Sequence, residues 1–272
     1  MQTRSDVLRR AKPLLGTIVS IEVVAGERGR SGAMDAIADA FAAVQTIHHA
    51  MSAHSTDSDL ARLARAAPGS TVPVDRHTCA VLGAAQYWTS ASAHAFDPLR
   101  AARRLARPGL RDGLMRASHG SGSLAALRIV DDTSVVPDGA LPLDLGGIAK
   151  GYAVDAAVEI LRSRGVDSAL VNAGGDLRAF GRRQWTLHLR HPSTASLAKR
   201  LLRLKEGAVA TSVRGEDFVP KRRLAPGWQC ACVLAPDCMT ADALTKWALQ
   251  ADEPCFALRR ALRIHRARLV RW

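Results

Sequence analysis

The chain has 272 residues, 47% of them hydrophobic, and a formal net charge of +13. This length and composition allow a sizeable buried core, arranged as one large domain or two small ones. Aromatic residues are few (five Trp, five Phe and two Tyr), which argues against an extended stacking surface for single-stranded nucleic acid. The charge comes mostly from arginines spread along the chain without zinc-finger spacing, so we expect no nucleic-acid partner. A solvated arginine-rich surface is the favoured interpretation, and a surface that attracts acidic partners or nucleotides is the alternative.

The first half of the chain alternates between strand and helix patterns. Residues 16–24 alternate as a strand does, and the alanine-rich stretch 31–50 keeps its apolar residues at helical spacing. Stretches broken by Pro and Gly separate the later helices. The predicted elements are a strand at 16–24, helices at 31–50 and 78–93, a short helix through Leu60 and Leu63 that ends at Pro68 and Gly69, and short helices and loops up to residue 123.

The second half is richer in strands. Predicted strands lie at 127–130, 141–145, 169–172, 177–180 and 185–189, and a helix at 148–164 lies between the second and third. The tail 262–272 partly alternates polar and apolar residues, which suits an exposed edge strand or hairpin. The pattern predicts a mixed α/β fold, and no composition shift marks a cut into independent domains.

The five cysteines are an odd number without a disulfide-like spacing, which favours a reducing compartment. Cys230 and Cys232 fall on one face of a probable strand, so we interpret them as core residues. Glu22 interrupts the apolar run near the start of the chain, which favours a strand over a signal peptide. No segment is long enough to span a membrane. We therefore expect a cytoplasmic protein.

The most informative stretch is a strand-to-helix turn within residues 143–155. Gly146 and Gly147 stand at the turn, and Lys150 follows in the first helical turn. Glycine lets the backbone approach a ligand closely, and the first helical N–H groups have no partner inside the helix. The turn therefore suits a phosphate, although a glycine pair can also serve only as a tight turn. Asp144 would repel a phosphate, which suggests a divalent cation or a hydrogen-bonded base nearby.

The sequence LDLGGIAKGYAVD of this turn resembles the central motif of the ApbE family, enzymes that move FMN from FAD onto a threonine hydroxyl of a target protein. Further segments resemble family motifs in the same order, and the resemblance covers roughly residues 10 to 272. These segments are Leu15–Thr17, Met51–His54 with Ser58–Leu60, Ala95–Pro98, Asn172–Asp176, Ala210–Ser212 and Met239–Thr245.

The resemblance implies one ApbE-like flavin transferase domain over residues 1–272, with a β-sheet core and a helical lobe that enclose FAD. It also implies the reaction: a threonine oxygen of an acceptor protein attacks the FMN phosphorus of FAD, and AMP leaves. Such phosphoryl transfer depends mostly on positioning and charge neutralisation. A Mg²⁺ ion that bridges the pyrophosphate is the implied metal cofactor.

The resemblance carries over to named positions of this chain. The implied magnesium ligands are the backbone carbonyl of Gly147, the carboxylate of Asp242 and the hydroxyl of Thr245. Leu15 and His54 stand where the family more often has methionine and tyrosine. The implied FAD-contacting residues are Leu15, His54, Ala95, Phe96, Asp97, Asp144 and Lys150.

The implied metal helix departs from the family pattern. Many members place a threonine four residues after the aspartate, whereas Lys246 stands there and Thr245 is three residues on. Both positions lie near the helix face of Asp242. Two interpretations stay open: a tolerated variant with magnesium still bound, or an ammonium group where the metal would sit.

A second departure concerns the catalytic base. The family usually has a loop with His-Ile-x-Asp-Pro-x-Thr-Gly after the Ala-Thr-Ser element, whereas Val213–Trp228 has no histidine. A general base contributes about a hundred- to ten-thousand-fold in rate. The sequence therefore leaves the catalytic residue unknown, and two other functions stay open: FAD storage or sensing without catalysis, and an FAD pyrophosphatase that forms FMN and AMP. Candidate substitutes for the base are Glu216, Asp217, His188 and His191.

Overall fold

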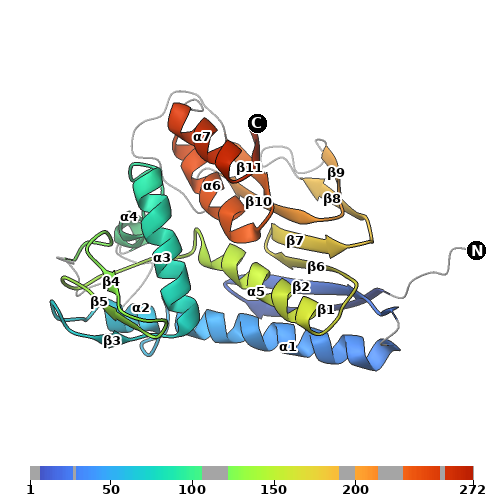
Figure 1. Cartoon of the computed structure of the whole chain (residues 1–272), viewed down its shortest axis with the longest axis horizontal. Helices are drawn as coiled ribbons and strands as arrows, with labels where there is room; N and C mark the ends of the chain where they lie inside the picture. Colours follow the sequence, from blue (N-terminus) through green and yellow to red (C-terminus); the bar gives the residue numbers. More distant parts are fainter. Residues whose placement is uncertain are drawn as a thin grey trace, which may run out of the picture. The chain divides into compact units, whose positions relative to one another are not determined.

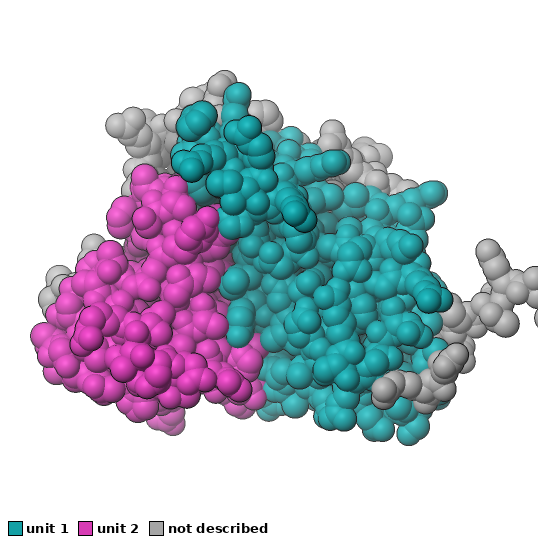
Figure 2. All heavy atoms as spheres, in the orientation of Figure 1, with its two compact units in different colours: residues 1–45, 150–272 teal, residues 46–149 magenta. Residues whose placement is uncertain are grey.

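The computed structural model describes residues 7–26, 29–105, 122–189, 200–213, 229–251 and 255–271. The chain divides into two compact units, which Figure 2 distinguishes by colour. Unit 1 comprises residues 1–45 and 150–272, and unit 2 comprises residues 46–149. The single domain over 1–272 stays a prediction. Each unit is described below by itself.

Unit 1 contains a seven-stranded antiparallel sheet with the strand order β1-β2-β6-β7-β10-β11-β12 (Figure 1). The strands at its two edges, β1 and β12, carry arginine and lysine side chains, several of them exposed, as at Arg9 and Lys12. The strands of the sheet are β1 (Val7–Leu14), β2 (Thr17–Val24), β6 (Ser168–Ala173), β7 (Asp176–Gly181), β10 (Gly207–Val213), β11 (Cys230–Ala235) and β12 (Arg268–Arg271).

Two tight hairpin turns lie next to each other at one end of this sheet. Leu15 and Gly16 join β1 to β2 with φ angles of +57° and +71°, and Gly174 and Gly175 join β6 to β7 with φ angles of +64° and +103°. A Cβ added at Gly174 would lie 2.5 Å from Oγ1 of Thr17, so only glycine fits between the turns. Asp176, the first residue of β7, therefore lies at this crowded end of the sheet.

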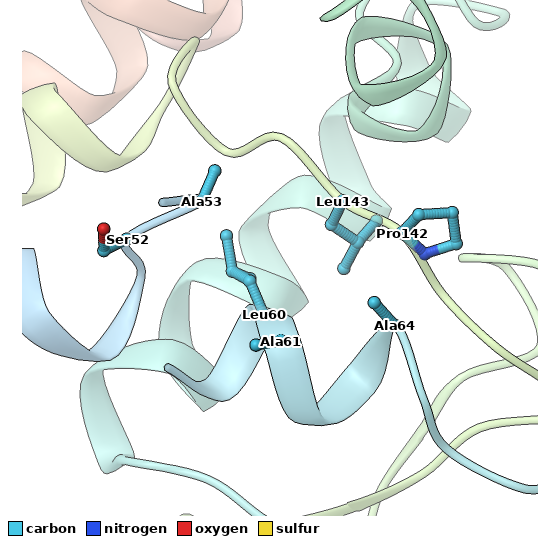
Figure 3. Close-up of a pocket in the computed structure, with 7 residues that line it drawn as sticks. All are labelled: Ser52, Ala53, Leu60, Ala61, Ala64, Pro142 and Leu143. Carbon is cyan, nitrogen blue, oxygen red and sulfur yellow. The ribbon is translucent and has the colours of Figure 1, made fainter. Parts of the chain in front are cut away.

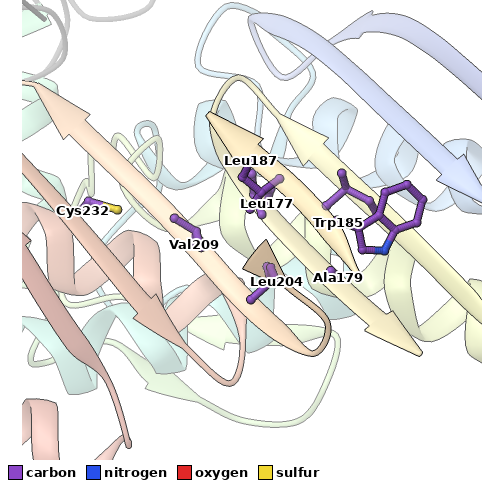
Figure 4. Close-up of a cluster of buried hydrophobic side chains, with 8 residues drawn as sticks. Leu177, Ala179, Trp185, Leu187, Leu204, Val209 and Cys232 are labelled. Atoms are coloured by element: carbon purple, nitrogen blue, oxygen red, sulfur yellow. The ribbon is translucent and has the colours of Figure 1, made fainter. Parts of the chain in front are cut away.

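The two faces of the sheet are covered differently. Helix α6 (Cys238–Gln250) packs on β10 and β11, and α5 (Ala149–Ser163) lies on the same face. A ribbon of β8 (Trp185–Leu189) and β9 (Arg200–Leu204) packs on the opposite face. Figure 4 shows the apolar cluster between ribbon and sheet. Its buried members are Leu170, Leu177, Ala179, Trp185, Leu187, Leu204, Val209 and Cys232.

Two more helices complete the described part of unit 1. Helix α1 (Gly29–Ala50) begins in unit 1 and ends in unit 2, and its apolar stripe from Ala33 to Ile47 is buried. Helix α7 (Phe256–Ile264) precedes β12. Within the described residues, no helix is both long and apolar enough to cross a bilayer.

Unit 2 combines short helices with a small three-stranded sheet of order β3-β5-β4. The buried carboxylate of Asp59 joins α2 to α3, because it accepts hydrogen bonds from the backbone N–H of Asp75 (2.8 Å) and from the hydroxyl of Thr78. The elements are α2 (Asp59–Leu63), β3 (Val72–Pro73), α3 (Arg76–Ala91), α4 (Pro98–Leu105), β4 (Arg128–Ile129) and β5 (Ser134–Val136).

The mixed helix and sheet architecture confirms the predicted fold class, and two local predictions are wrong. Residues 141–145 form no strand: the segment is irregular, with the N–H of Leu141 bonded to Leu63 O (2.9 Å) and that of Asp144 to Pro98 O (3.1 Å). In the tail, residues 262–264 end α7, and only Arg268–Arg271 forms the expected edge strand. Strand β1 is an element that the sequence did not indicate.

Candidate active site

Four charged side chains gather on the helix-covered face of the unit 1 sheet. Nζ of Lys150, in the first turn of α5, lies 3.1 Å from Oδ2 of Asp176 on β7. Nζ of Lys246 lies 3.1 Å from Oδ1 of Asp242, one turn earlier on α6. Both carboxylates are buried, with side-chain exposures of 1% and 0%. The site thus consists of two ion pairs and is formally neutral.

Close contact between α5 and α6 holds these pairs together. A Cβ added at Gly151 would lie 2.4 Å from the carbonyl oxygen of Cys238, so glycine alone permits this approach. The Gly151 N–H donates to Oδ2 of Asp242 at 3.3 Å. The predicted anion-binding turn and the predicted metal helix therefore meet through Gly151.

Asp155 fixes the start of α6 from the neighbouring helix. Its carboxylate accepts hydrogen bonds from the backbone N–H groups of Cys238 (2.9 Å) and Met239 (2.8 Å), and it pairs with Arg178 at 3.0 Å. Burial raises the pKa of Asp155 to about 6, against the opposing effect of these N–H groups and of Arg178. Asp155 is therefore a positioning residue for the helix that carries Asp242.

A chain of hydroxyl groups links Lys246 to the backbone of its own helix. The Lys246 ammonium donates to Oγ of Ser212 on β10. Oγ of Ser212 lies 2.7 Å from Oγ1 of Thr245, and the Thr245 hydroxyl donates to the carbonyl oxygen of Asp242 at 2.7 Å. All three side chains, of Lys246, Ser212 and Thr245, are buried. The Thr245 hydroxyl is thus engaged with Ser212 and with the backbone.

Asp176 is buried close to the other three charges of the site. Burial raises the pKa of its carboxyl group, and the negative charge of Asp242 raises it further. The ammonium groups of Lys150 and Lys246 act in the opposite direction. The pKa of Asp176 therefore depends on the other three charges of the two ion pairs.

The implied magnesium ligands of unit 1, Asp242 and Thr245, do not fit this ion as they are arranged, because Lys246 is paired with Asp242 and the Thr245 hydroxyl is bonded to Ser212. Magnesium needs oxygen ligands at about 2.1 Å in a near-octahedral shell. An ion at that distance from Oδ1 of Asp242 would lie within about 5 Å of the Lys246 ammonium, which would repel it. Among the described residues, no three His, Cys, Asp or Glu side chains are grouped to hold a metal ion.

The predicted FAD-contacting residues of the α3–α4 connection have structural partners of their own. Asp97 accepts a hydrogen bond from the N–H of Arg100 (3.1 Å) and so caps α4, while Phe96 is buried. Ala95 follows Ala93 and His94, which have the left-handed φ angles +47° and +64°. Backbone strain of this kind is common at ligand sites, and the FAD contact of Ala95, Phe96 and Asp97 stays a prediction.

The remaining predicted residues of unit 2 lie in turns. Oδ1 of Asp144 accepts a hydrogen bond from the N–H of Gly146 at 2.9 Å, which stabilises the turn before α5, and Gly147 lies half-buried in that turn. His54 is exposed. Ala53 and Leu143, the sequence neighbours of His54 and Asp144, line a small and mostly apolar pocket (Figure 3). It is lined by Ser52, Ala53, Leu60, Ala61, Ala64, Pro142 and Leu143.

Leu15 and the candidate bases complete the predicted set. Leu15 is half-buried in the β1–β2 turn. His188 is exposed on the β8–β9 ribbon, on the sheet face opposite to Lys150 and Asp242. Glu216, Asp217 and His191 lie outside the described residues.

Sequence reasoning missed Asp176 and Ser212 as parts of the site. Asp176 ends the Asn172–Asp176 segment and Ser212 ends the Ala210–Ser212 segment, so both residues belong to segments that resemble family motifs. Strand pairing places both residues on the helix-covered face, since Arg178 is opposite Ala208 in the register. Alternation along β7 and β10 would have indicated this face once the pairing was known.

Comparisons with known proteins show the family and the fold of this chain. The profile of the ApbE family matches residues 15–258. The FAD:protein FMN transferase of Treponema pallidum (strain Nichols) is 29% identical over 236 residues, which cover 77% of this chain and 65%, less than two thirds, of that relative.

Solved structures resemble the fold over nearly the whole chain. The apo flavinyl transferase ApbE of Pseudomonas stutzeri has a TM-score of 0.79 at 21% identity, over 100% of this chain and 93% of that one. The flavin transferase ApbE of Vibrio cholerae has a TM-score of 0.79 at 20% identity, over 98% and 93%. At such identities the likeness establishes the fold, and the profile establishes the family. This chain is therefore a member of the ApbE family.

Proposed function

We propose that this protein transfers FMN from FAD to a threonine hydroxyl of an acceptor protein and releases AMP. The observation that carries the proposal is the joining of Lys150, at the start of α5, to Asp242 and Lys246 through the Gly151 contact. An ammonium in the first turn of a helix, where the helix dipole also favours negative charge, is a suitable contact for the FAD pyrophosphate. Family membership and the name of the Treponema relative support the same activity.

The chemistry asks three things of the chain. The pyrophosphate has to be held in line with the attacking oxygen, negative charge on the leaving AMP has to be stabilised, and the threonine proton has to leave. The ammonium of Lys150, at the start of α5, serves the first two needs. In the bond exchange, the threonine oxygen forms a bond to the FMN phosphorus while the bond from that phosphorus to the AMP oxygen breaks.

The resemblance implies magnesium dependence, with Gly147, Asp242 and Thr245 as the ligands. The transfer described above does not depend on the ion, because Lys246 is paired with the carboxylate that would bind it. His54, Ala95, Phe96, Asp97 and Asp144 of unit 2, and Leu15 of unit 1, stay predicted FAD contacts. Free thiols at all five cysteines support the proposal of a reducing, cytoplasmic compartment.

A transfer assay tests the proposal. The purified protein is incubated with FAD, magnesium and extracts of its host as the source of acceptor, and in-gel flavin fluorescence and AMP release are followed. A fluorescent acceptor band, with FMN on threonine by mass spectrometry, is the expected result. AMP and FMN without a labelled acceptor would indicate a pyrophosphatase, and bound intact FAD without AMP would indicate storage or sensing.

Lys150→Gln is the matching variant, since it removes the proposed pyrophosphate contact. Loss of one charge-assisted hydrogen bond of about 1.5–3 kcal/mol should weaken FAD binding about 10- to 100-fold. Lys205→Gln is the control, because Lys205 is exposed in the turn between β9 and β10. Equal FAD affinity of the two variants, measured by flavin fluorescence, would remove Lys150 from the site.

A further inference from the structure

Lys246 is a buried cation whose side chain is only 9% exposed. Burial of an ammonium group is costly unless fixed partners replace its water shell. Lys246 has such partners, because its Nζ contacts Oδ1 of Asp242 at 3.1 Å and Oγ of Ser212. The ammonium is therefore built into the site as a fixed positive charge.

The position of this charge relative to Asp242 is the decisive observation. Asp242 has no exposed side-chain surface, and its other oxygen accepts the Gly151 N–H at 3.3 Å. The hydroxyl of Thr245 is engaged with Ser212 and with the carbonyl oxygen of Asp242. Lys246 thus stands beside the carboxylate oxygen at which a metal ion would have to arrive.

Charge balance argues in the same direction. Asp176 and Asp242 supply two negative charges, and Lys150 and Lys246 supply two positive ones. In the absence of the nucleotide, a divalent cation would add two positive charges to a buried group that is already neutral, beside an ammonium that it would repel. Removal of the Lys246 charge would instead leave a surplus negative charge, which is the condition that attracts a metal ion.

We propose that the Lys246 ammonium takes the place of the divalent cation, so that this protein binds FAD without a metal ion. For the identity of its ligand, this inference rests on the proposed function. The pairing of Lys246 with Asp242 is independent of that function. The inference identifies Lys246 as a positioning residue that holds the Asp242 carboxylate and supplies positive charge to the nucleotide site.

The wild-type protein gives the first test. Mn²⁺ alone is titrated and followed by electron paramagnetic resonance, and FAD binding is followed by flavin fluorescence in EDTA and in excess Mg²⁺. We expect no Mn²⁺ site in the micromolar range and FAD affinities that agree within about threefold. A stoichiometric micromolar Mn²⁺ site, or FAD binding that needs Mg²⁺, would overturn the inference.

A gain of metal binding gives the second test. Lys246→Thr removes the ammonium and places a hydroxyl one turn after Asp242. We expect this variant to bind Mn²⁺ at least tenfold more tightly than the wild type, and to melt at a higher temperature with Mn²⁺ than in EDTA. The control Asp242→Asn/Lys246→Thr removes both charges and should gain no Mn²⁺ site. An equal gain in this control would refute the role of Asp242.

The FAD and Mn²⁺ measurements distinguish a failure of this inference from a failure of the proposed function. If FAD binds under neither condition, the proposed function fails, while the Mn²⁺ titrations of wild type and variants still decide whether Lys246 excludes a metal. If Lys246→Thr does not fold, the wild-type titrations alone decide. FAD binding in EDTA together with transfer of FMN would support both statements.

Discussion

At the residue scale, Asp155 differs from the other acids of the site because its partners are mostly backbone groups. It holds the N–H groups of Cys238 and Met239 and pairs with Arg178, while burial raises its pKa to about 6. The same carboxyl group in an unfolded chain has a pKa near 3.8. Its contribution to stability therefore depends on pH.

The first stability prediction follows from the sign of that shift. Between about pH 4 and pH 6 the unfolded chain releases the Asp155 proton while the folded protein still holds it. The contribution of Asp155 is fully present below about pH 4 and is lost as pH rises through 6, by roughly 1–3 kcal/mol. The Asp155 contribution to the free energy of unfolding, measured with urea, should therefore be smaller at pH 7 than at pH 4.5. Asp155→Asn should make the difference between the two pH values smaller by roughly 1–3 kcal/mol.

Asp132→Asn is the matched control for charge. Asp132 is exposed and pairs with Arg76 at the surface, so its removal should leave the pH dependence almost unchanged. An Asp155→Asn profile parallel to that of the wild type would show that Asp155 titrates normally in the folded protein.

At the element scale, the contact between α5 and α6 depends on the missing side chain of Gly151. Alanine favours helix over glycine by up to about 1 kcal/mol, but its Cβ would lie 2.4 Å from a backbone oxygen of Cys238. The backbone cannot yield without moving a helix. The steric cost should therefore exceed the gain in helix propensity.

Gly151→Ala should lower the unfolding free energy by about 1–3 kcal/mol, the usual cost of overpacking. Gly83→Ala in α3 is the matched control, since a Cβ there meets only the flexible end of Ile129, at 3.3 Å. The control should be neutral or stabilising by up to about 1 kcal/mol. Thermal or urea unfolding of both variants measures the difference, and equal stability of the two would contradict the close α5–α6 contact.

Helices with clear spacing were predictable from the sequence, and the irregular buried segment was not. Residues 31–50 and 148–164 have apolar stripes that match α1 and α5 within two residues. The run 141–145 has the composition of a buried strand because all of its residues except Asp144 are apolar. Its N–H groups at Leu141 and Asp144 bond instead to the carbonyl groups of Leu63 and Pro98, which are distant in sequence.

The candidate site followed the same rule. Lys150, Asp242 and Lys246 lie in motifs with helical spacing, and the sequence raised the possibility of an ammonium at the metal position. Asp176 and Ser212 join the site through strand pairing, which no local spacing records. The partners of Asp155 also depend on the approach of α5 to α6.

At the scale of the whole molecule, the five cysteines report on the integrity of the fold. Cys79, Cys230, Cys232 and Cys238 are buried, and Cys255 is exposed. Burial raises the pKa of the Cys230 thiol to about 12 and also raises those of Cys232 and Cys238. Thiolate formation at these positions is therefore suppressed in the folded protein.

Alkylation by iodoacetamide at pH 8 should therefore label one thiol per native chain within minutes. Mass spectrometry should place the label on Cys255, and the other four should react only as fast as the protein opens. Cys255→Ser is the control, with no rapid labelling expected. Rapid labelling of Cys238 in the native protein would contradict the packing of α6 on the sheet.

The basic side chains on β1 and β12 have a consequence for association between copies of this chain. An open sheet edge is a template on which another strand can add, and flanking positive charges and proline oppose that addition. Arg9, Arg10, Lys12 and Pro13 occupy one edge, and Arg268 and Arg271 occupy the other. Part of the +13 net charge of the chain thus acts as a safeguard against edge-to-edge aggregation, a role that requires no acidic ligand.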